Sequence, residues 1–308
     1  MERSETGTIT RRQLLAGGLT GTAVIVVASC GPDANNAIPK GEIFVARVKK
    51  VPRLDPSTRD WEYGPQATIE MGSQEMALPT KKVPTVTQLT VRAVHDGTSI
   101  GIRIEWDDAE TNDLTVRVDD FRDACAVLLA AGAGDASVRA MGTPASPATL
   151  LHWKADWERD VQLGVQGISD VYPNLSVDTY PPLIVDNPTE ITPMDYVKAG
   201  ATDWLPGLAV GNPLSAPTRP TSVEKLVAIG FGTSTSCKTQ DAIGAGQRTK
   251  KGWRVAIVKP MTASDESETV LHAGGTATCA FAVWSGKDKD NGGHKSPSVN
   301  TFRMRLEA

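Results

Sequence analysis

The chain of 308 residues has few of the side chains on which enzymes and metalloproteins most often depend. It contains four cysteines and four histidines, and only 5% of its residues are aromatic. His-Glu-x-x-His, a common metallohydrolase motif, does not occur in it. A catalytic nucleophile needs a base beside it, and a zinc site needs clustered ligands. The sequence therefore gives little support to a hydrolase or a zinc enzyme.

Two other classes of protein need features that are also missing. Covalent attachment of a c-type haem requires a Cys-x-x-Cys-His segment, and none occurs. A nucleic-acid-binding protein usually carries a basic patch, whereas this chain has a formal net charge of −4 and its charges are dispersed. We therefore expect neither a c-type cytochrome nor a nucleic-acid partner.

The hydrophobic run near the N-terminus is too short and too weak to serve as a membrane span. It covers residues 14–28, about 15 residues, and glycine and threonine interrupt it, whereas a spanning helix needs roughly 20 predominantly apolar residues. Arg11 and Arg12 precede this run, and Val-Ala-Ser before Cys30 follows it. This order resembles a twin-arginine export signal that ends in a lipobox.

The export signal sets the expected organisation of the chain. We expect residues 1–29 to be removed and Cys30 to become the lipidated first residue of the mature protein. Residues 30–41 consist mainly of turn-forming and small polar side chains, which is typical of a tether. The folded part would then be residues 42–308, outside the cytoplasm (periplasmic or extracytoplasmic) and anchored to the membrane by its lipid.

From residue 42 onward, apolar residues alternate with polar ones far more often than they follow a helical period. Residues 88–95 and 99–106 alternate on either side of an Asp-Gly turn, which predicts a β-hairpin. Further alternating runs predict strands at residues 42–48, 227–232, 253–258, 277–284 and 301–306. We therefore expect a mainly β, single-domain protein, either a β-sandwich or an open barrel.

The alternation is lost between about residues 141 and 225. This region is rich in proline, asparagine and aspartate, and it contains one helix candidate at residues 147–161. Long irregular segments inside a compact domain are uncommon and are often functional. We expect a large loop-and-helix insertion here, of which residues 162–222 have no assigned role.

Three cysteines remain after Cys30. Cys237 and Cys279 lie in strand-like segments, so they are the expected pair if an exported protein forms one disulfide. Cys125 lies within the apolar run 124–129 and is expected to be a small buried hydrophobic residue.

Two segments have an unusual arrangement of possible ligands. Met141 lies between small residues and a proline-bounded turn, and Lys295 lies in a Gly-Gly-His-Lys-Ser loop between two predicted strands. A methionine thioether is a soft ligand suited to haem iron. The alternatives are a core position for the methionine and a solvated position for the lysine, and spacing alone leaves both open.

The order of several short segments resembles the haem-binding γ-subunit family of ethylbenzene dehydrogenase and dimethylsulfide dehydrogenase. These enzymes are type II molybdenum enzymes of the DMSO reductase superfamily. The resembling segments span roughly residues 87–307 and are 104–108, 121–127, 141–142, 152–155, 252–255, 259–261, 280–286 and 292–298.

The resemblance implies a non-covalent haem b whose iron is held by Met141 and Lys295. His152 and His294 are the alternative iron ligands, because imidazole is a common axial donor. His294 and Lys295 are neighbours in sequence, so in an extended loop their side chains point in opposite directions. Only one of these two can then face the iron.

Tryptophans lie close to the proposed ligands in the sequence. Trp153 and Trp284, together with Trp157, are candidate walls of the haem pocket. Large aromatic residues are also frequent members of a protein core, and this alternative stays open for each of the three.

The resemblance further implies an electron-transfer subunit that performs no substrate chemistry itself. Its partners would be a molybdopterin catalytic subunit and an iron–sulfur subunit, with a soluble cytochrome or a membrane electron carrier at the other end of the transfer. The competing hypothesis is a surface lipoprotein without a cofactor, in which a β-sandwich binds glycan or another ligand through exposed tryptophans.

Overall fold

The computed structural model describes residues 41–76, 78–132, 135–175 and 191–308. The predicted signal at residues 1–29, the lipidation site Cys30 and the tether up to residue 40 lie outside the described residues. In the described part of the chain, no helix is both long enough and apolar enough to cross a bilayer.

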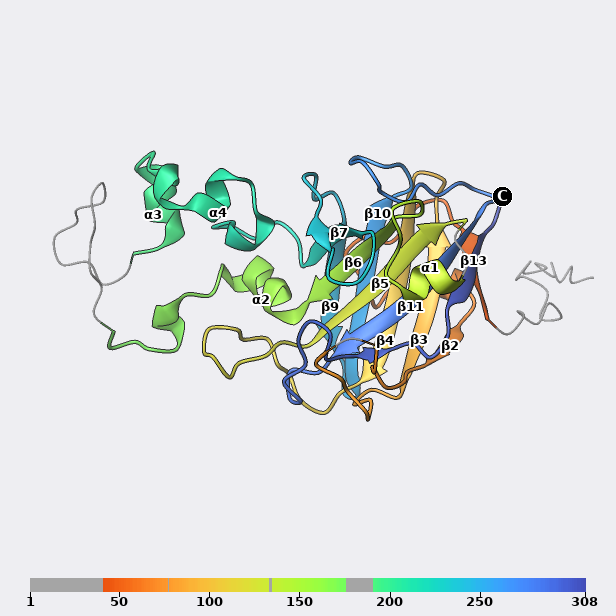
Figure 1. Ribbon diagram of the computed structural model, residues 1–308, viewed down its shortest axis with the longest axis horizontal. Helices are drawn as coiled ribbons and strands as arrows, with labels where there is room; N and C mark the ends of the chain where they lie inside the picture. Colours follow the sequence, from red (N-terminus) through yellow and green to blue (C-terminus); the bar gives the residue numbers. More distant parts are fainter. Residues whose placement is uncertain (1–40, 77, 133–134, 176–190) are drawn as a thin grey trace, which may run out of the picture. The chain divides into compact units, whose positions relative to one another are not determined.

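A single sheet contains the strands of the described residues (Figure 1). Most of its strands follow the order β8-β7-β6-β5-β11-β13-β1-β3-β4-β10-β9, while β12 pairs with β11 and β2 pairs with β3. The strands are β1 (Glu42–Arg47), β2 (Ala67–Glu70), β3 (Gln88–His95), β4 (Ser99–Asp107), β5 (Ala124–Ala131), β6 (Ala148–Lys154), β7 (Val223–Ala228), β8 (Thr235–Ser236), β9 (Ile243–Arg248), β10 (Gly252–Pro260), β11 (Thr276–Trp284), β12 (Ser296–Pro297) and β13 (Phe302–Leu306).

The sheet curls so that its two halves face each other across one hydrophobic core. The indole of Trp153 in β6 packs edge-on against Trp253 in β10 and Trp106 in β4, with ring centroids 5.0 and 6.1 Å apart. Gly246 in β9 allows this contact, because a Cβ atom there would lie 2.2 Å from the Trp153 ring. The protein is therefore a mainly β, single-domain, sandwich-like structure, as the alternating pattern predicts.

The alternation of side chains gives β5 and β11 two different faces. The odd-numbered residues of both strands face the core and include Cys125, Val127, Cys279 and Val283. The even-numbered residues face the opposite side, where alanine predominates: Ala124, Ala126, Ala280 and Ala282. The outer face of this half of the sheet is thus apolar and carries very short side chains.

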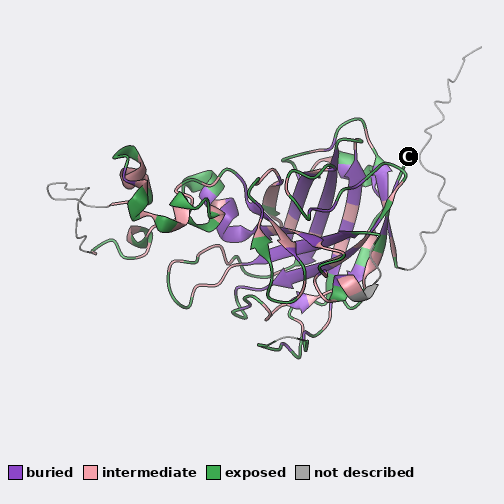
Figure 2. Cartoon of the chain, turned by 45° about the horizontal axis from the view of Figure 1, so that its top comes forward, coloured by how far each residue is buried: buried purple, intermediate pink, exposed green. Residues whose placement is uncertain are grey.

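Short helices fill the connections between strands. They are η1 (Arg59–Tyr63), α1 (Asp135–Arg139), α2 (Ala155–Leu163), η2 (Ile168–Asp170), α3 (Pro193–Lys198), η3 (Thr202–Trp204), α4 (Pro206–Ala209) and η4 (Pro213–Ser215). The helices α3, η3, α4 and η4 belong to the predicted insertion and contact one another. Most described residues of this segment are exposed or half-buried, in contrast to the strands (Figure 2).

The predicted hairpin is confirmed as β3 and β4, and the strands predicted near residues 42, 253, 277 and 301 are confirmed as β1, β10, β11 and β13. Two local predictions are wrong. The helix candidate at residues 147–161 is strand β6 followed by helix α2, because β6 pairs with β5 on one side and β7 on the other. The strand predicted at residues 227–232 is β7, which begins and ends about four residues earlier.

The predicted disulfide is also wrong. Cys125, Cys237 and Cys279 are all buried free thiols. Cys279 lies in β11, whereas Cys237 follows β8, and three strands separate these two in the sheet. A disulfide needs Cα atoms within about 7 Å of each other. Neighbouring strands lie about 4.8 Å apart, and these two cysteines are separated by four such spacings. They therefore cannot pair. Cys125 is a buried small hydrophobic residue, as predicted.

Candidate functional site

The outer face carries a cavity of about 940 Å³ over β5, β6, β7 and β11. The short side chains described above form its floor, and β6 and β7 add Leu150 and Leu226. Ligand cavities for cofactor-sized molecules typically have volumes of about 300–1,000 Å³ and mostly apolar walls. The alternation of alanines on one side of two adjacent strands thus creates room for a large, flat, apolar ligand.

Met141 lies at one wall of the cavity, directly after α1. Its φ of 63° is in the left-handed region, which residues other than glycine seldom adopt. Its backbone N–H donates to the Val138 carbonyl at 3.0 Å, and its carbonyl accepts from the Gly230 N–H at 3.1 Å. Unusual backbone conformations of this kind are concentrated at functional sites.

Gly142 completes the turn that presents Met141. Its φ is 87°, and a Cβ atom at this position would lie 2.4 Å from the Ala228 carbonyl oxygen and 2.9 Å from the Ala148 nitrogen. Both the conformation and the close approach to β6 and β7 therefore require glycine. This requirement explains the Met-Gly pair in the sequence.

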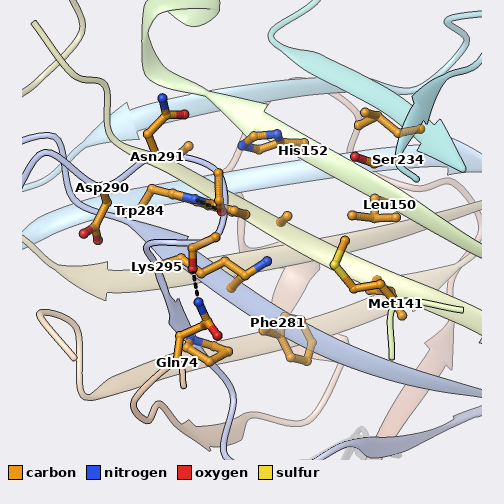
Figure 3. A pocket seen from close by; sticks show the side chains of 18 of the residues that line it. Gln74, Met141, Leu150, His152, Ser234, Phe281, Trp284, Asp290, Asn291 and Lys295 are labelled. Carbon is orange, nitrogen blue, oxygen red and sulfur yellow. Dashed lines mark hydrogen bonds between the residues drawn. The ribbon is translucent and has the colours of Figure 1, made fainter. Parts of the chain in front are cut away.

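Lys295 reaches the cavity from the loop between β11 and β12. Its Nζ lies 5.1 Å from the centroid of the Trp284 ring. Burial lowers the pKa of Lys295 below its usual range, because removal from water disfavours the charged amine. Figure 3 shows the Lys295 amine and the Met141 thioether pointing toward each other into the same space.

The two candidate histidines have different positions. His152 in β6 lines the cavity, and its ring lies 4.7 Å from that of Trp284. Its Nε2 is buried and finds no hydrogen-bond partner among the described residues. His294 does not line the cavity, and its Nδ1 lies 2.7 Å from Oδ1 of Asp290, which does line it. The structure therefore brings Met141, Lys295 and His152 together and leaves His294 aside.

The pKa of His152 is held well below its usual range. Burial is the main cause, and the neighbouring cations Lys154, Arg122 and Lys295 act in the same direction. His152 is therefore a neutral imidazole at physiological pH, with one nitrogen available to a ligand in the cavity.

The tryptophans divide between the cavity and the core. Trp284 lines the cavity, and its Nε1 donates to the Gly292 carbonyl at 3.1 Å. Trp153 is completely buried in the core, where its Nε1 donates to Oε2 of Glu158 at 3.0 Å. Trp157 packs between the cationic groups of Lys154 and Arg219. Neither Trp153 nor Trp157 lines the cavity, so the core alternative applies to both.

The placement of Trp153 follows from a signal in the sequence. His152 and Trp153 are neighbours in one strand, and neighbouring residues of a strand face opposite sides of the sheet. Once His152 faces the cavity, Trp153 must face the core.

Charged residues at the cavity were not identified from the sequence. Lys154 forms a buried ion pair with Glu224, and both line the cavity. Burial lowers the pKa of Lys154 to about 8, against the opposing effect of Glu224. Arg122 also lines the cavity and donates to Oδ2 of Asp156 at 2.8 Å. In sequence these residues are isolated charges, and only the pairing of β5, β6 and β7 brings them together.

Bare metal ions have no evident site in the part of the chain that the structure describes. No group of three or more histidine, cysteine, aspartate or glutamate side chains is placed there to hold one.

The fold and the cavity define a class, namely a sandwich-like β protein with a cofactor-sized apolar cavity on the outer face of one half of its sheet. Residues 58–173 match the family model described as ethylbenzene dehydrogenase. This region includes Met141 and His152 and ends before Lys295.

Two curated relatives match over most of the chain. The chlorate reductase subunit gamma of Ideonella dechloratans is 22% identical over 287 residues, covering 91% of this chain and 93% of that protein. The putative respiratory nitrate reductase heme subunit ORF7 of Haloferax mediterranei is 21% identical over 277 residues, covering 89% and 77%. Together with the family model, these relatives show that the chain is similar to proteins of the ethylbenzene dehydrogenase γ type.

Among solved structures, a putative carbohydrate-binding protein from Bacteroides uniformis is similar with a TM-score of 0.43 and 9% identity. The similarity covers 86% of this chain and 99% of that one.

Proposed function

We propose that this protein is a haem b electron-transfer subunit in which Met141 and Lys295 are the axial ligands of the iron. The observation that carries the proposal is the meeting of the two side chains in one cavity. The Met141 thioether and the Lys295 amine point toward each other above a floor of small apolar residues (Figure 3). The name of the Haloferax relative, a heme subunit, supports the same cofactor.

The residues of the cavity fit a non-covalent haem. The floor is flat and apolar because Ala126, Ala280 and Ala282 leave space above the sheet. A haem exchanges single electrons, and axial ligands together with burial tune its potential. Met141 would supply a soft sulfur donor from a fixed turn, and Lys295 would supply a nitrogen donor.

Lysine can hold iron only as the neutral amine. With an ordinary pKa near 10.4, deprotonation at pH 7 costs about 4–5 kcal/mol, at about 1.4 kcal/mol per pKa unit. Burial lowers the pKa of Lys295, which is the direction that ligation requires. The bond to iron would offset the rest of this cost.

The wider role is also part of the proposal. The relatives are named as subunits of chlorate and nitrate reductases, which supports a partner complex containing a molybdopterin catalytic subunit and an iron–sulfur subunit. Electrons would pass between that complex and a soluble cytochrome or a membrane carrier. Export through the twin-arginine signal at residues 1–29 and a lipid on Cys30 would keep the carrier in the periplasm, at the membrane surface.

The competing glycan-binding hypothesis depends on exposed aromatic residues, and the tryptophans do not favour it. Six of the seven tryptophans are buried, and only Trp204, with 54% of its surface exposed, could contribute to a sugar-stacking platform. A single exposed tryptophan on the insertion does not make such a platform.

The visible spectrum of the purified protein tests the proposal. We expect a Soret band with sharp α and β bands on reduction, and a protein that stays colourless after reconstitution with haemin would contradict the cofactor. Met141→Leu preserves volume and should cost less than about 1.5 kcal/mol of stability, yet it should convert the low-spin spectrum to high-spin. Met261→Leu is the matched control, because Met261 is buried in the core away from the cavity. An unchanged spectrum in Met141→Leu would remove this ligand assignment.

A further inference from the structure

The loop that carries Lys295 offers two possible iron ligands, and the structure points to the device that selects between them. We propose that Asp290 is a positioning residue that holds His294 out of the cavity and so makes Lys295 the side chain that faces the haem iron. This inference rests on the proposed function and concerns the same site.

The alternation of side chains near β12 defines the two choices. Lys295 and Pro297 line the cavity, whereas Ser296 and His294 do not. This pattern follows the pairing of β12 with β11, in which Pro297 lies opposite Ala282 on the cavity side. A slip of one residue in this pairing would reverse the pattern and turn His294 toward the cavity.

The pairing of β12 with β11 does not by itself strongly determine whether Lys295 or His294 faces the cavity. β12 consists of only two residues, Ser296–Pro297, and Gly292 and Gly293 precede the ligand pair. A two-residue ladder specifies its register weakly by itself. The hydrogen bonds from the Gly72 N–H to the Pro297 carbonyl and from the Ser298 N–H to the Phe281 carbonyl, both 2.8 Å, hold its C-terminal end and not the ligand pair before it. Histidine is moreover the commonest metal ligand and needs no costly deprotonation at neutral pH. Without a further restraint, His294 would compete with Lys295.

Asp290 supplies that restraint. Its side chain is completely buried, and its Oδ1 lies 2.7 Å from Nδ1 of His294. Its Oδ2 accepts from the backbone N–H of Ser285 at 3.0 Å, which fixes the carboxylate to the end of β11. The Lys81 amine donates to both carboxylate oxygens, at 2.6 and 2.7 Å. His294 is thus tied to a carboxylate that cannot move.

Lys81 is itself held in place by a separate segment of the chain. Its backbone exchanges two hydrogen bonds of 2.7 Å with Gln74. The Gln74 side chain donates to the Gly293 carbonyl at 2.6 Å (Figure 3), and Trp284 donates to that of Gly292. The turn before His294 is therefore fixed at several points, and in the conformation that they fix His294 does not line the cavity.

The test removes Lys295 and asks whether His294 can replace it. In haem-reconstituted Lys295→Ala, we expect a high-spin spectrum, because Asp290 still holds His294. In Lys295→Ala/Asp290→Ala, we expect the low-spin fraction to rise about tenfold or more, since hydrogen bonds to charged groups are among the stronger ones. Electron paramagnetic resonance and near-infrared magnetic circular dichroism should then report a histidine–methionine pair. Adding His294→Ala should abolish this signal.

Two outcomes would overturn the inference. The first is a low-spin, His294-dependent spectrum in Lys295→Ala alone, since it would mean that Asp290 does not hold His294. The second is a folded Lys295→Ala/Asp290→Ala protein that stays high-spin. If this variant does not fold, Lys81→Met/Asp290→Leu in the Lys295→Ala background replaces the buried ion pair with neutral side chains and allows the same measurement.

Failure of the proposed function is distinguishable from failure of the inference. If Lys295→Ala leaves the amine–iron signature of the unmodified protein unchanged, Lys295 is not a ligand, and the proposed site fails. If Lys295 is a ligand but release of Asp290 does not recruit His294, only the inference fails. His152→Ala in the same background shows whether a recruited imidazole comes from β6 instead.

Discussion

The turn that carries Met141 and the loop that carries Lys295 are built in opposite ways. The Met141 turn is fixed by main-chain hydrogen bonds and by a glycine pressed against β6 and β7. The Lys295 loop has main-chain hydrogen bonds too, such as that from the His294 N–H to the Asn291 carbonyl at 2.9 Å, but it is also held by the buried Lys81–Asp290 ion pair, which has no counterpart in the Met141 turn. The first depends on backbone shape and the second on charge.

Because of this difference, each proposed ligand should be sensitive to a different kind of change. A thioether carries no proton, so Met141 needs only to be placed correctly. An amine must lose a proton before it binds iron, and Lys295 lies where burial lowers its pKa. A perturbation of charge should therefore affect the lysine side alone, and a perturbation of backbone shape should affect the methionine side alone.

The largest effect is expected from breaking the ion pair behind the Lys295 loop. Lys81→Met leaves the fully buried carboxylate of Asp290 without its cation, which typically costs about 3–5 kcal/mol of folding free energy. Chemical denaturation measures this cost. Lys287→Met is the control, because the Lys287–Glu110 pair is about half exposed and should be worth at most about 1 kcal/mol. Equal losses for the two variants would contradict the contrast.

Breaking the Met141 turn should cost slightly less. Gly142→Ala combines a left-handed backbone, worth about 1–2 kcal/mol, with overpacking against the Ala228 carbonyl, worth about 1–3 kcal/mol. Gly200→Ala is the control, because Gly200 has a φ of 70° but open space around it, so only the backbone part applies. Denaturation should separate the two variants, and reconstituted Gly142→Ala should lose the methionine ligand while keeping the lysine.

The sequence predicts the strands whose signals are local. The hairpin of β3 and β4 has an Asp-Gly turn between two alternating runs, and both strands form as predicted. β6 lacks such a signal, because it has buried residues on both faces and one of its two partners, β7, follows only after the long insertion. The wrong disulfide prediction has the same cause, since the order of strands between Cys279 and Cys237 depends on long-range pairing.

The candidate site was predictable only in part. Spacing singled out Met141 and Lys295 as unusual, but only the family resemblance joined them, because no local pattern relates two residues so far apart. In the sequence, part of the alanine floor is visible only as an apolar run at residues 124–129. The run does not show which of its side chains face the cavity and which face the core. The roles of Asp290 and Lys81 could not be read from sequence, because each is an ordinary charged residue until the fold buries it.

The difference in protonation leads to a third prediction, in which pH acts on one ligand only. As pH falls, protonation of Lys295 should release the iron while Met141 stays bound, so the low-spin spectrum should give way to a high-spin one. Lys295→Ala should show no such transition. Spectra recorded along a pH titration check this, and a transition that survives in Lys295→Ala would assign the titration to another group.

The same shift has a consequence for the haem-free protein. The pKa of Lys295 is lower in the folded state than its usual value near 10.5. Between these two values the unfolded chain binds more protons than the folded one, so stability should rise with pH across that window. Lys295→Met should flatten this rise, which denaturation at a series of pH values measures.

The smallest effect is expected from replacing one tryptophan on the cavity face of the sheet and, for comparison, one on the core face. Trp284→Phe keeps an aromatic ring in the cavity but loses the hydrogen bond from Nε1 to Gly292, which is worth about 0.5–1.5 kcal/mol. Because this bond fixes the Lys295 loop, the change should broaden the amine–iron signal and leave the methionine unaffected. Trp253→Phe is the matched control on the core face, where Nε1 donates to Asp123. It should lower stability without changing the haem spectrum, and identical spectra for both variants would mean that Trp284 does not position Lys295.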